Sequence, residues 1–129
     1  MKKILFRGKT HDGEWVEGLP FFGDDGNTID GIEGNNRKLF KVIPETVGQF
    51  TGLTDKNGKK IFEGDIINER PPMNIYTFRG FVVWDDGRAL WRLLFTEHPE
   101  YLAVLGTYST FYTVVGNIYD NPELLKVTK

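Results

Sequence analysis

Apolar side chains along this chain gather in short runs, and Gly, Asn, Asp and Pro separate one run from the next. Runs of this length, rich in aromatic and β-branched residues, are typical of β-strands. The pattern predicts strands at residues 4–7, 14–18, 19–22, 28–32, 38–43, 47–50, 65–68, 81–84, 89–95 and 110–115. Many short strands joined by tight turns indicate a mainly β chain that folds as a small barrel or sandwich.

Four dipeptides predict hairpin turns between these strands, and they are Asp12-Gly13, Asp25-Gly26, Asn57-Gly58 and Asp86-Gly87. Each can supply the positive φ angles that a tight turn requires. The clearest hairpin joins residues 81–84 to residues 89–95, and both of its arms are nearly continuous in apolar side chains. That pattern indicates strands covered on both faces, or strands at an interface with a partner.

Three segments depart from the strand pattern. Arg70-Pro71-Pro72 predicts the end of strand pairing and a long exposed loop, because proline donates no ladder hydrogen bond. Residues 97–105, which include a proline near their start, favour a short helix. The run Asn121-Pro122-Glu123 predicts a capped helical turn over residues 121–125.

The composition narrows the class of protein. The 129 residues fit one domain, and the aromatic fraction of 14% with 15 glycines suits a pleated, tightly turned chain. The absence of cysteine excludes disulfides, thiolate nucleophiles and Cys-ligated metals. No apolar run reaches the length of a signal-peptide core or a membrane span, so we expect a cytoplasmic protein without a membrane partner. The net charge of -2 argues against a chain built around a polyanion but leaves room for a local basic face.

The stretch from Glu45 to Ile66, reading ETVGQFTGLTDKNGKKIFEGDI, resembles the signature of the YopX family of phage and prophage proteins. The opening at residues 4–9 and 13–18 and the ending at residues 115–125 are similar to the two ends of family members. This resemblance implies a protein of the bacterial host cell with a β-hairpin region at residues 1–45. The resemblance further implies an SH3-like barrel at residues 46–129, and we expect the two regions to make one compact unit. The family's function is uncharacterised, so the resemblance implies no reaction.

Glu63 and Asp65 stand two residues apart, so an extended chain would place both carboxylates on one face. A hydrolytic pair or a divalent-ion site needs that arrangement. The structural alternative, which we favour, is that Gly64 forms a sharp turn while Asp65 accepts backbone N–H groups at the start of a strand.

Other candidates for chemistry are few. His11 and His98, the only histidines in the sequence, lack the spacing of a zinc site. Ser109 lacks the Gly-x-Ser-x-Gly elbow of the α/β-hydrolases. We therefore expect no catalytic residue, no metal and no cofactor.

Basic side chains gather between residues 37 and 60, and they are Arg37, Lys38, Lys41, Lys56, Lys59 and Lys60. If the strand at residues 38–43 pairs with the turn at residues 56–60, a positive surface able to bind nucleic acid results. Further along, residues 76–81 interleave aromatic side chains with Arg79, a combination able to stack single-stranded bases. The structural alternatives are solubilising lysines at a hairpin tip and aromatic residues in a core.

An apolar cluster supplies a second candidate surface, formed by Trp84, Trp91, Leu93 and Phe95. Its size hints at self-association or a protein partner, with a well-filled core as the alternative. We expect an accessory protein that acts by binding itself or a protein partner. Nucleic-acid binding is the alternative, and a metal-assisted hydrolase at Glu63 and Asp65 is the least favoured function.

Overall fold

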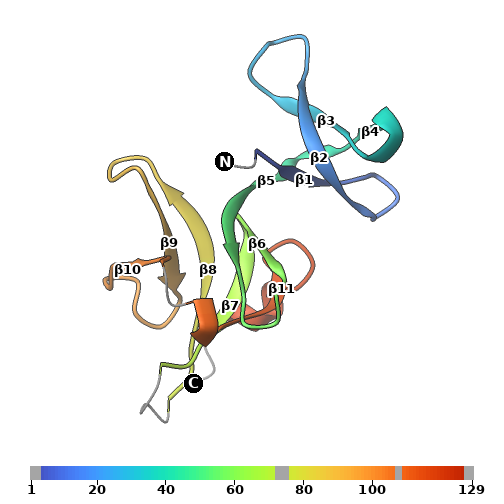
Figure 1. Cartoon of the computed structure of the whole chain (residues 1–129). Helices are drawn as coiled ribbons and strands as arrows, with labels where there is room; N and C mark the ends of the chain where they lie inside the picture. The colour runs from blue at the N-terminus through green and yellow to red at the C-terminus, as the bar shows by residue number, and fades with distance from the viewer. Residues whose placement is uncertain (1–3, 72–75, 107–108, 127–129) are drawn as a thin grey trace. The chain divides into compact units, whose positions relative to one another are not determined.

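The structure, a computed structural model, describes residues 4–71, 76–106 and 109–126. It is mainly β and divides into two compact units, Met1–Phe50 (unit 1) and Thr51–Lys129 (unit 2). Figure 1 shows unit 1 in blue to green and unit 2 in green to red. The long strand β5 (Ile43–Thr54) runs through the boundary, which the sequence-based division placed at residue 45.

Unit 1 is an antiparallel sheet in the strand order β4-β3-β2-β1-β5. Its elements before β5 are β1 (Phe6–Lys9), β2 (Trp15–Phe22), β3 (Ile29–Glu33), the 3-10 helix η1 (Asn35–Arg37) and β4 (Leu39–Lys41). Ile32 and Val42 are its fully buried aliphatic side chains among the described residues. β4 ends the sheet, so one edge of unit 1 is a strand of three residues.

Unit 2 contains the end of β5, which pairs with β6 (Lys60–Phe62), and a five-stranded antiparallel sheet. The sheet order is β10-β9-β8-β7-β11. The remaining elements are β7 (Asp65–Glu69), β8 (Phe78–Asp85), β9 (Leu90–Phe95), β10 (Ala103–Val104), η2 (Ser109–Phe111), β11 (Tyr112–Asn117) and η3 (Pro122–Leu125). The core of unit 2 is built by Ile61, Ile67, Val82, Leu93, Phe95, Leu105 and Tyr112.

The four predicted hairpins are confirmed, as β1–β2, β2–β3, β5–β6 and β8–β9. Gly13, Gly26 and Gly58 have φ between 73° and 89°. In the fourth turn Ala89, with φ 55°, takes the left-handed conformation that was expected of Gly87. The Asx-Gly pairs therefore predicted the positions of all four hairpins, although in the fourth turn the positive φ angle belongs to a neighbouring residue.

The strand boundaries differ from the prediction in two places. Residues 14–18 and 19–22 form one strand, β2, and residues 47–50 are the middle of the longer β5. The strand expected at residues 38–43 is interrupted, because Val42 lies between β4 and β5. The loop predicted after Arg70 begins where β7 ends at Glu69, while part of it, residues 72–75, lies outside the described residues.

The helix predicted at residues 97–105 is wrong. This segment turns and then pairs with β9 through β10, and the N–H of Leu105 donates to the carbonyl of Trp91 at 3.0 Å. Leu105 is thereby buried in the core of unit 2. Burial of an apolar side chain against an existing sheet outweighed a weak local helix preference.

The SH3-like barrel is not confirmed, because the two antiparallel sheets are not closed into a barrel. The C-terminal turn forms as η3, with Pro122 at its first positions. Its predicted cap differs, since Asn121 Oδ1 accepts the N–H of Asn117 at 3.2 Å. No helix among the described residues combines the length and apolar character needed to cross a bilayer.

Candidate binding surfaces

The Glu63–Asp65 pair lies in a turn, where the extended geometry of a hydrolytic pair is absent. Gly64 has φ 90°, so the chain reverses between the two carboxylates. Asp65 is only 1% exposed, and its Oδ2 accepts the N–H of Phe62 at 2.8 Å. Asp65 therefore stabilises the turn that starts β7, which is the structural alternative drawn from the sequence.

Asp55 is a buried carboxylate whose role the sequence did not reveal. It is 5% exposed and accepts three backbone N–H groups: those of Asn57 and Lys59 at 2.9 Å each and that of Val114 at 3.0 Å. Burial alone would raise the pKa of Asp55, but these hydrogen bonds and the charge of Lys59 outweigh it and lower the pKa. Asp55 thus joins the β5–β6 turn to β11.

The remaining candidates for chemistry stand apart from one another. His11 is exposed in the β1–β2 turn, and Ser109 begins η2. His98 stacks on Tyr101 with 4.8 Å between ring centroids and lies 3.5 Å from Glu100. Within the described ranges, no three His, Asp or Glu side chains gather as a metal site would require.

The six basic residues of the predicted nucleic-acid surface fall into two groups. Arg37, Lys38 and Lys41 belong to unit 1, where β4 pairs with β3, while Lys56, Lys59 and Lys60 belong to unit 2. The pairing that would have joined the groups is therefore not formed. Contact of either group with nucleic acid stays a prediction.

The apolar cluster expected at a partner interface is largely core. Leu93 is 1% exposed and Phe95 is buried beside it in unit 2. Trp84 and Trp91 face each other across β8 and β9 with 5.0 Å between ring centroids, and Trp84 remains exposed. The Trp84 indole donates to Asp86 Oδ1 at 2.7 Å, so this pair caps the hairpin end of the sheet.

Unit 1 carries an exposed apolar surface that the sequence analysis did not single out. Strand register places Leu19 opposite Glu33 and Glu33 opposite Leu39, and in the next row Phe21 opposite Gly31. Directly opposed residues of an antiparallel sheet project from the same face. We name this surface, formed by Leu19, Phe21 and Leu39 around Gly31, the apolar face.

Two apolar side chains of this face, those of Phe21 and Leu39, lie against Gly31, which has no side chain to separate them. A Cβ added to Gly31 would lie 3.2 Å from Leu39 Cδ1 and 3.4 Å from Phe21 Cβ. Leu19, Phe21 and Leu39 are nevertheless between 44% and 54% exposed. The sequence does contain a sign of this face, the run Leu19-Pro20-Phe21-Phe22. All four residues are apolar, whereas a strand with one face in solvent usually alternates apolar and polar residues.

Unit 2 carries a polar groove made of two adjoining hollows of about 520 and 270 Å³, which share Asn68 and Thr77. Asn68 lies between Thr113 of β11 and Arg79 of β8, so the three share one face of the sheet. Among the residues that the structure describes, the cationic side chains lining the groove are Lys56, Arg70, Arg79 and Lys126, and Glu97 is the carboxylate among them. Of the six basic residues predicted from the sequence, Lys56 takes part.

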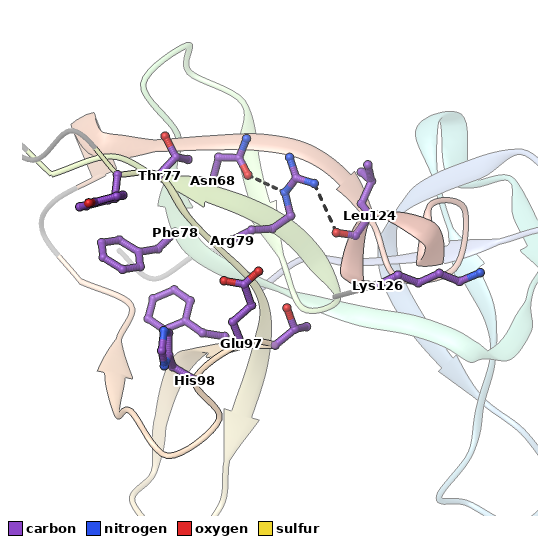
Figure 2. Close-up of a pocket in the computed structure, with 11 residues that line it drawn as sticks. Asn68, Thr77, Phe78, Arg79, Glu97, His98, Leu124 and Lys126 are labelled. Atoms are coloured by element: carbon purple, nitrogen blue, oxygen red, sulfur yellow. Dashed lines mark hydrogen bonds between the residues drawn. The ribbon is translucent and has the colours of Figure 1, made fainter. Parts of the chain in front are cut away.

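Arg79 is fixed within this groove. Figure 2 shows its guanidinium between Asn68 and Leu124, with Nε donating to Asn68 Oδ1 at 2.8 Å and Nη1 to the Leu124 carbonyl at 3.3 Å. Arginine has five N–H donors, so these two contacts leave others directed toward the groove or solvent. The aromatic rings of Tyr76 and Phe78 line the same hollow.

Glu69 lies on the opposite face of β7 from Asn68, beside Tyr112 in the strand register. Burial raises the pKa of Glu69 above its ordinary value of 4.5. When a carboxyl group has a raised pKa in the folded state, the folding stability of the protein decreases as the pH rises from the group's ordinary pKa through the folded one. We therefore expect Glu69→Gln to be modestly more stable than the wild type at pH 7 and no different below pH 4.5.

Urea unfolding of both proteins across this pH range measures the effect of Glu69→Gln. The matched control is Glu97→Gln, an exposed carboxylate of the same unit, which should leave the urea midpoint unchanged at both pH values. A Glu69→Gln variant less stable than the wild type at pH 7 would contradict the interpretation.

Comparison with protein-family models and with solved structures relates the whole described fold to known proteins. The family model for YopX protein matches residues 6–126. The chain belongs to the YopX family. A solved structure, the crystal structure of protein EF1440 from Enterococcus faecalis, is similar to this YopX chain at 26% identity and a TM-score of 0.59. The match covers 98% of this chain and 100% of that one, and no curated protein sequence matches the chain.

Proposed function

We propose that this YopX-family chain acts by binding a protein through the apolar face of unit 1, and that the partner is a second copy of the chain. The observation that supports this is the apolar character of a sheet face on which Leu19, Phe21 and Leu39 are exposed. Antiparallel sheets usually carry polar residues on the face left to solvent. A contiguous exposed apolar patch is instead typical of an interaction site.

Charge favours a second copy as the occupant. Glu33 lies in the same row as Leu19 and Leu39, and Lys41 lies beside Gly31 in the next row. The apolar face therefore carries a negative charge in one row of residues and a positive charge in the next row. A two-fold arrangement can set Glu33 of one protomer against Lys41 of the other while the apolar side chains meet between them.

The setting we propose is that of an accessory phage or prophage protein in the cytoplasm of a bacterial host, as the family resemblance implies. A different protein could bind the same face in place of a second copy. The experiment below distinguishes these two partners.

We expect Leu39→Glu to weaken self-association by about a hundredfold, since the dimer would have to bury a charge where it otherwise buries the leucine. Sedimentation equilibrium of the wild type and the variant at several concentrations measures the change. The matched control is Leu102→Glu in unit 2, because Leu102 is 49% exposed against 54% for Leu39. This control should associate like the wild type.

Two outcomes would contradict the proposal. A wild type that stays monomeric at millimolar concentration would exclude the second copy as partner. Equal dissociation of the Leu39→Glu and Leu102→Glu variants would show that the association does not use the apolar face. Circular dichroism of each variant establishes that its fold is retained.

A further inference from the structure

The groove of unit 2 concentrates positive charge in a chain whose net charge is -2. In the described part of the chain, four cationic side chains and one carboxylate line it. Overall attraction to polyanions is thus weak, and an anion needs a local cluster of positive charge such as this one. We infer that the groove binds single-stranded nucleic acid.

The cations stand on backbone positions that the fold holds in place. The N–H of Arg70 donates to the carbonyl of Phe111 at 3.0 Å, and the N–H of Lys56 donates to the carbonyl of Tyr112 at 3.0 Å. Arg70 is therefore tied to the end of η2, and Lys56 to the first residue of β11. The Arg79 guanidinium is held by Asn68 and Leu124 as described above, so this charge has a set position in the groove.

Hydroxyl and aromatic groups complete the arrangement. Thr77, Thr110 and Thr113 line the groove and can donate to phosphate oxygens. Tyr76, which is 67% exposed, lines the larger hollow together with Phe78. Cations that follow a backbone, next to aromatic rings on which bases stack, are the combination used by proteins that bind single strands.

The shape and the aromatic rings favour this ligand over two others. Duplex DNA is read by an element that projects into its groove, whereas this site is a hollow on a sheet. An acidic peptide would use the cations alone and would gain little from an exposed tyrosine beside them. The experiment separates the peptide from the nucleic acid.

Fluorescence anisotropy of a labelled oligothymidylate of about 15 nucleotides, at about 50 mM salt, tests the inference. The double variant Arg70→Glu with Lys126→Glu should bind at least tenfold more weakly than the wild type. Loss of two phosphate contacts should also lower the slope of log affinity against log salt by about 1.4. The matched control is Arg37→Glu with Lys38→Glu in unit 1, which changes the net charge equally and should leave binding unchanged.

Stacking is tested at Tyr76. We expect Tyr76→Ala to weaken binding about tenfold, while Tyr76→Phe stays within about twofold of the wild type because the ring is kept.

Three results would overturn the inference. The first is no anisotropy change for the wild type at low salt. The second is equal weakening by the Arg37/Lys38 control, which would show that binding follows the overall charge and does not use the groove. The third is displacement of the oligonucleotide by a polyglutamate peptide that binds at least as tightly and loses affinity in the Arg70/Lys126 variant, which would assign the groove to an acidic protein partner.

Discussion

An Asp55→Asn variant is expected to lose about 3 kcal/mol of folding free energy at neutral pH. The carboxylate is buried and accepts the backbone N–H groups of Asn57, Lys59 and Val114. An amide has one acceptor oxygen and one NH₂ group, so either orientation turns a donor toward a backbone donor. At least one buried N–H then loses its partner, and the remaining bonds are no longer charge-assisted.

The long-range hydrogen bond makes Asp55 more than a turn residue. Val114 lies 59 residues further along the chain, and its N–H donates to Asp55 Oδ2. The variant should therefore loosen the attachment of the β5–β6 turn to β11. Urea unfolding followed by circular dichroism measures the total loss, and hydrogen exchange at Val114 reports this contact directly.

Asp25→Asn is the matched control, because Asp25 makes the same kind of local contact at the surface. Its Oδ1 accepts the N–H groups of Asn27 and Thr28 in the β2–β3 turn. Asp25 is exposed, so water can replace the lost hydrogen bonds and the loss of stability should be much smaller. Equal losses in the two variants would contradict the role assigned to burial of Asp55.

Asp55 also predicts a pH dependence. Its folded pKa is lowered, so its contribution to stability is fully present above its ordinary value of 3.8 and is lost as the pH falls through the lower folded value. Wild-type stability should therefore fall more steeply below pH 3.8 than that of Asp55→Asn. A stability difference between the two proteins that does not shrink in acid would argue against this titration.

Gly18→Ala is expected to destabilise unit 1 by about 3 kcal/mol or more. A Cβ on Gly18 would lie 1.8 Å from the carbonyl oxygen of Glu33 and 2.7 Å from its carbonyl carbon. Both atoms belong to the backbone of β3, so no side chain can rotate away to make room. The strands β2 and β3 must separate locally, and the apolar face that spans them should be disturbed with them.

Gly34→Ala is the control for this substitution. Its φ of -94° suits alanine, and the nearest atom to an added Cβ is a ring carbon of Phe40 at 3.4 Å, an ordinary contact. Hydrogen exchange followed by mass spectrometry should show lost protection in residues 6–50 of Gly18→Ala and near wild-type protection in unit 2. Wild-type protection throughout Gly18→Ala, or equal losses in both units, would contradict the prediction.

Local sequence signals predicted the features that depend on few neighbouring residues. The Asx-Gly pairs located four hairpins because turn angles are set within about four residues. The same reasoning assigned Asp65 to a turn. Reasoning from local sequence failed for residues 97–105, because their conformation depends on the pairing of β10 with β9.

The candidate sites were less predictable, because each depends on which strands pair. Lys38 and Lys56 were expected on one surface, but β4 pairs with β3 and the two lysines belong to different units. Leu93 and Phe95 were candidates for an interface, and their strand turned out to form the centre of a core. Arg79 was noted in sequence, whereas its neighbours Asn68 and Leu124 were not.

The sequence by itself determined the family, the mainly β class, the hairpins and the absence of cysteine chemistry, since all of these follow from residue identity and short-range geometry. Only the tertiary structure decided that Leu19, Phe21 and Leu39 share an exposed face, that Asp55 reaches Val114, and that four cations line one groove. These depend on strand register between distant segments. A change of register by one residue exchanges the faces of a strand, and the register is fixed by how whole strands pair and pack, which no short stretch of sequence shows.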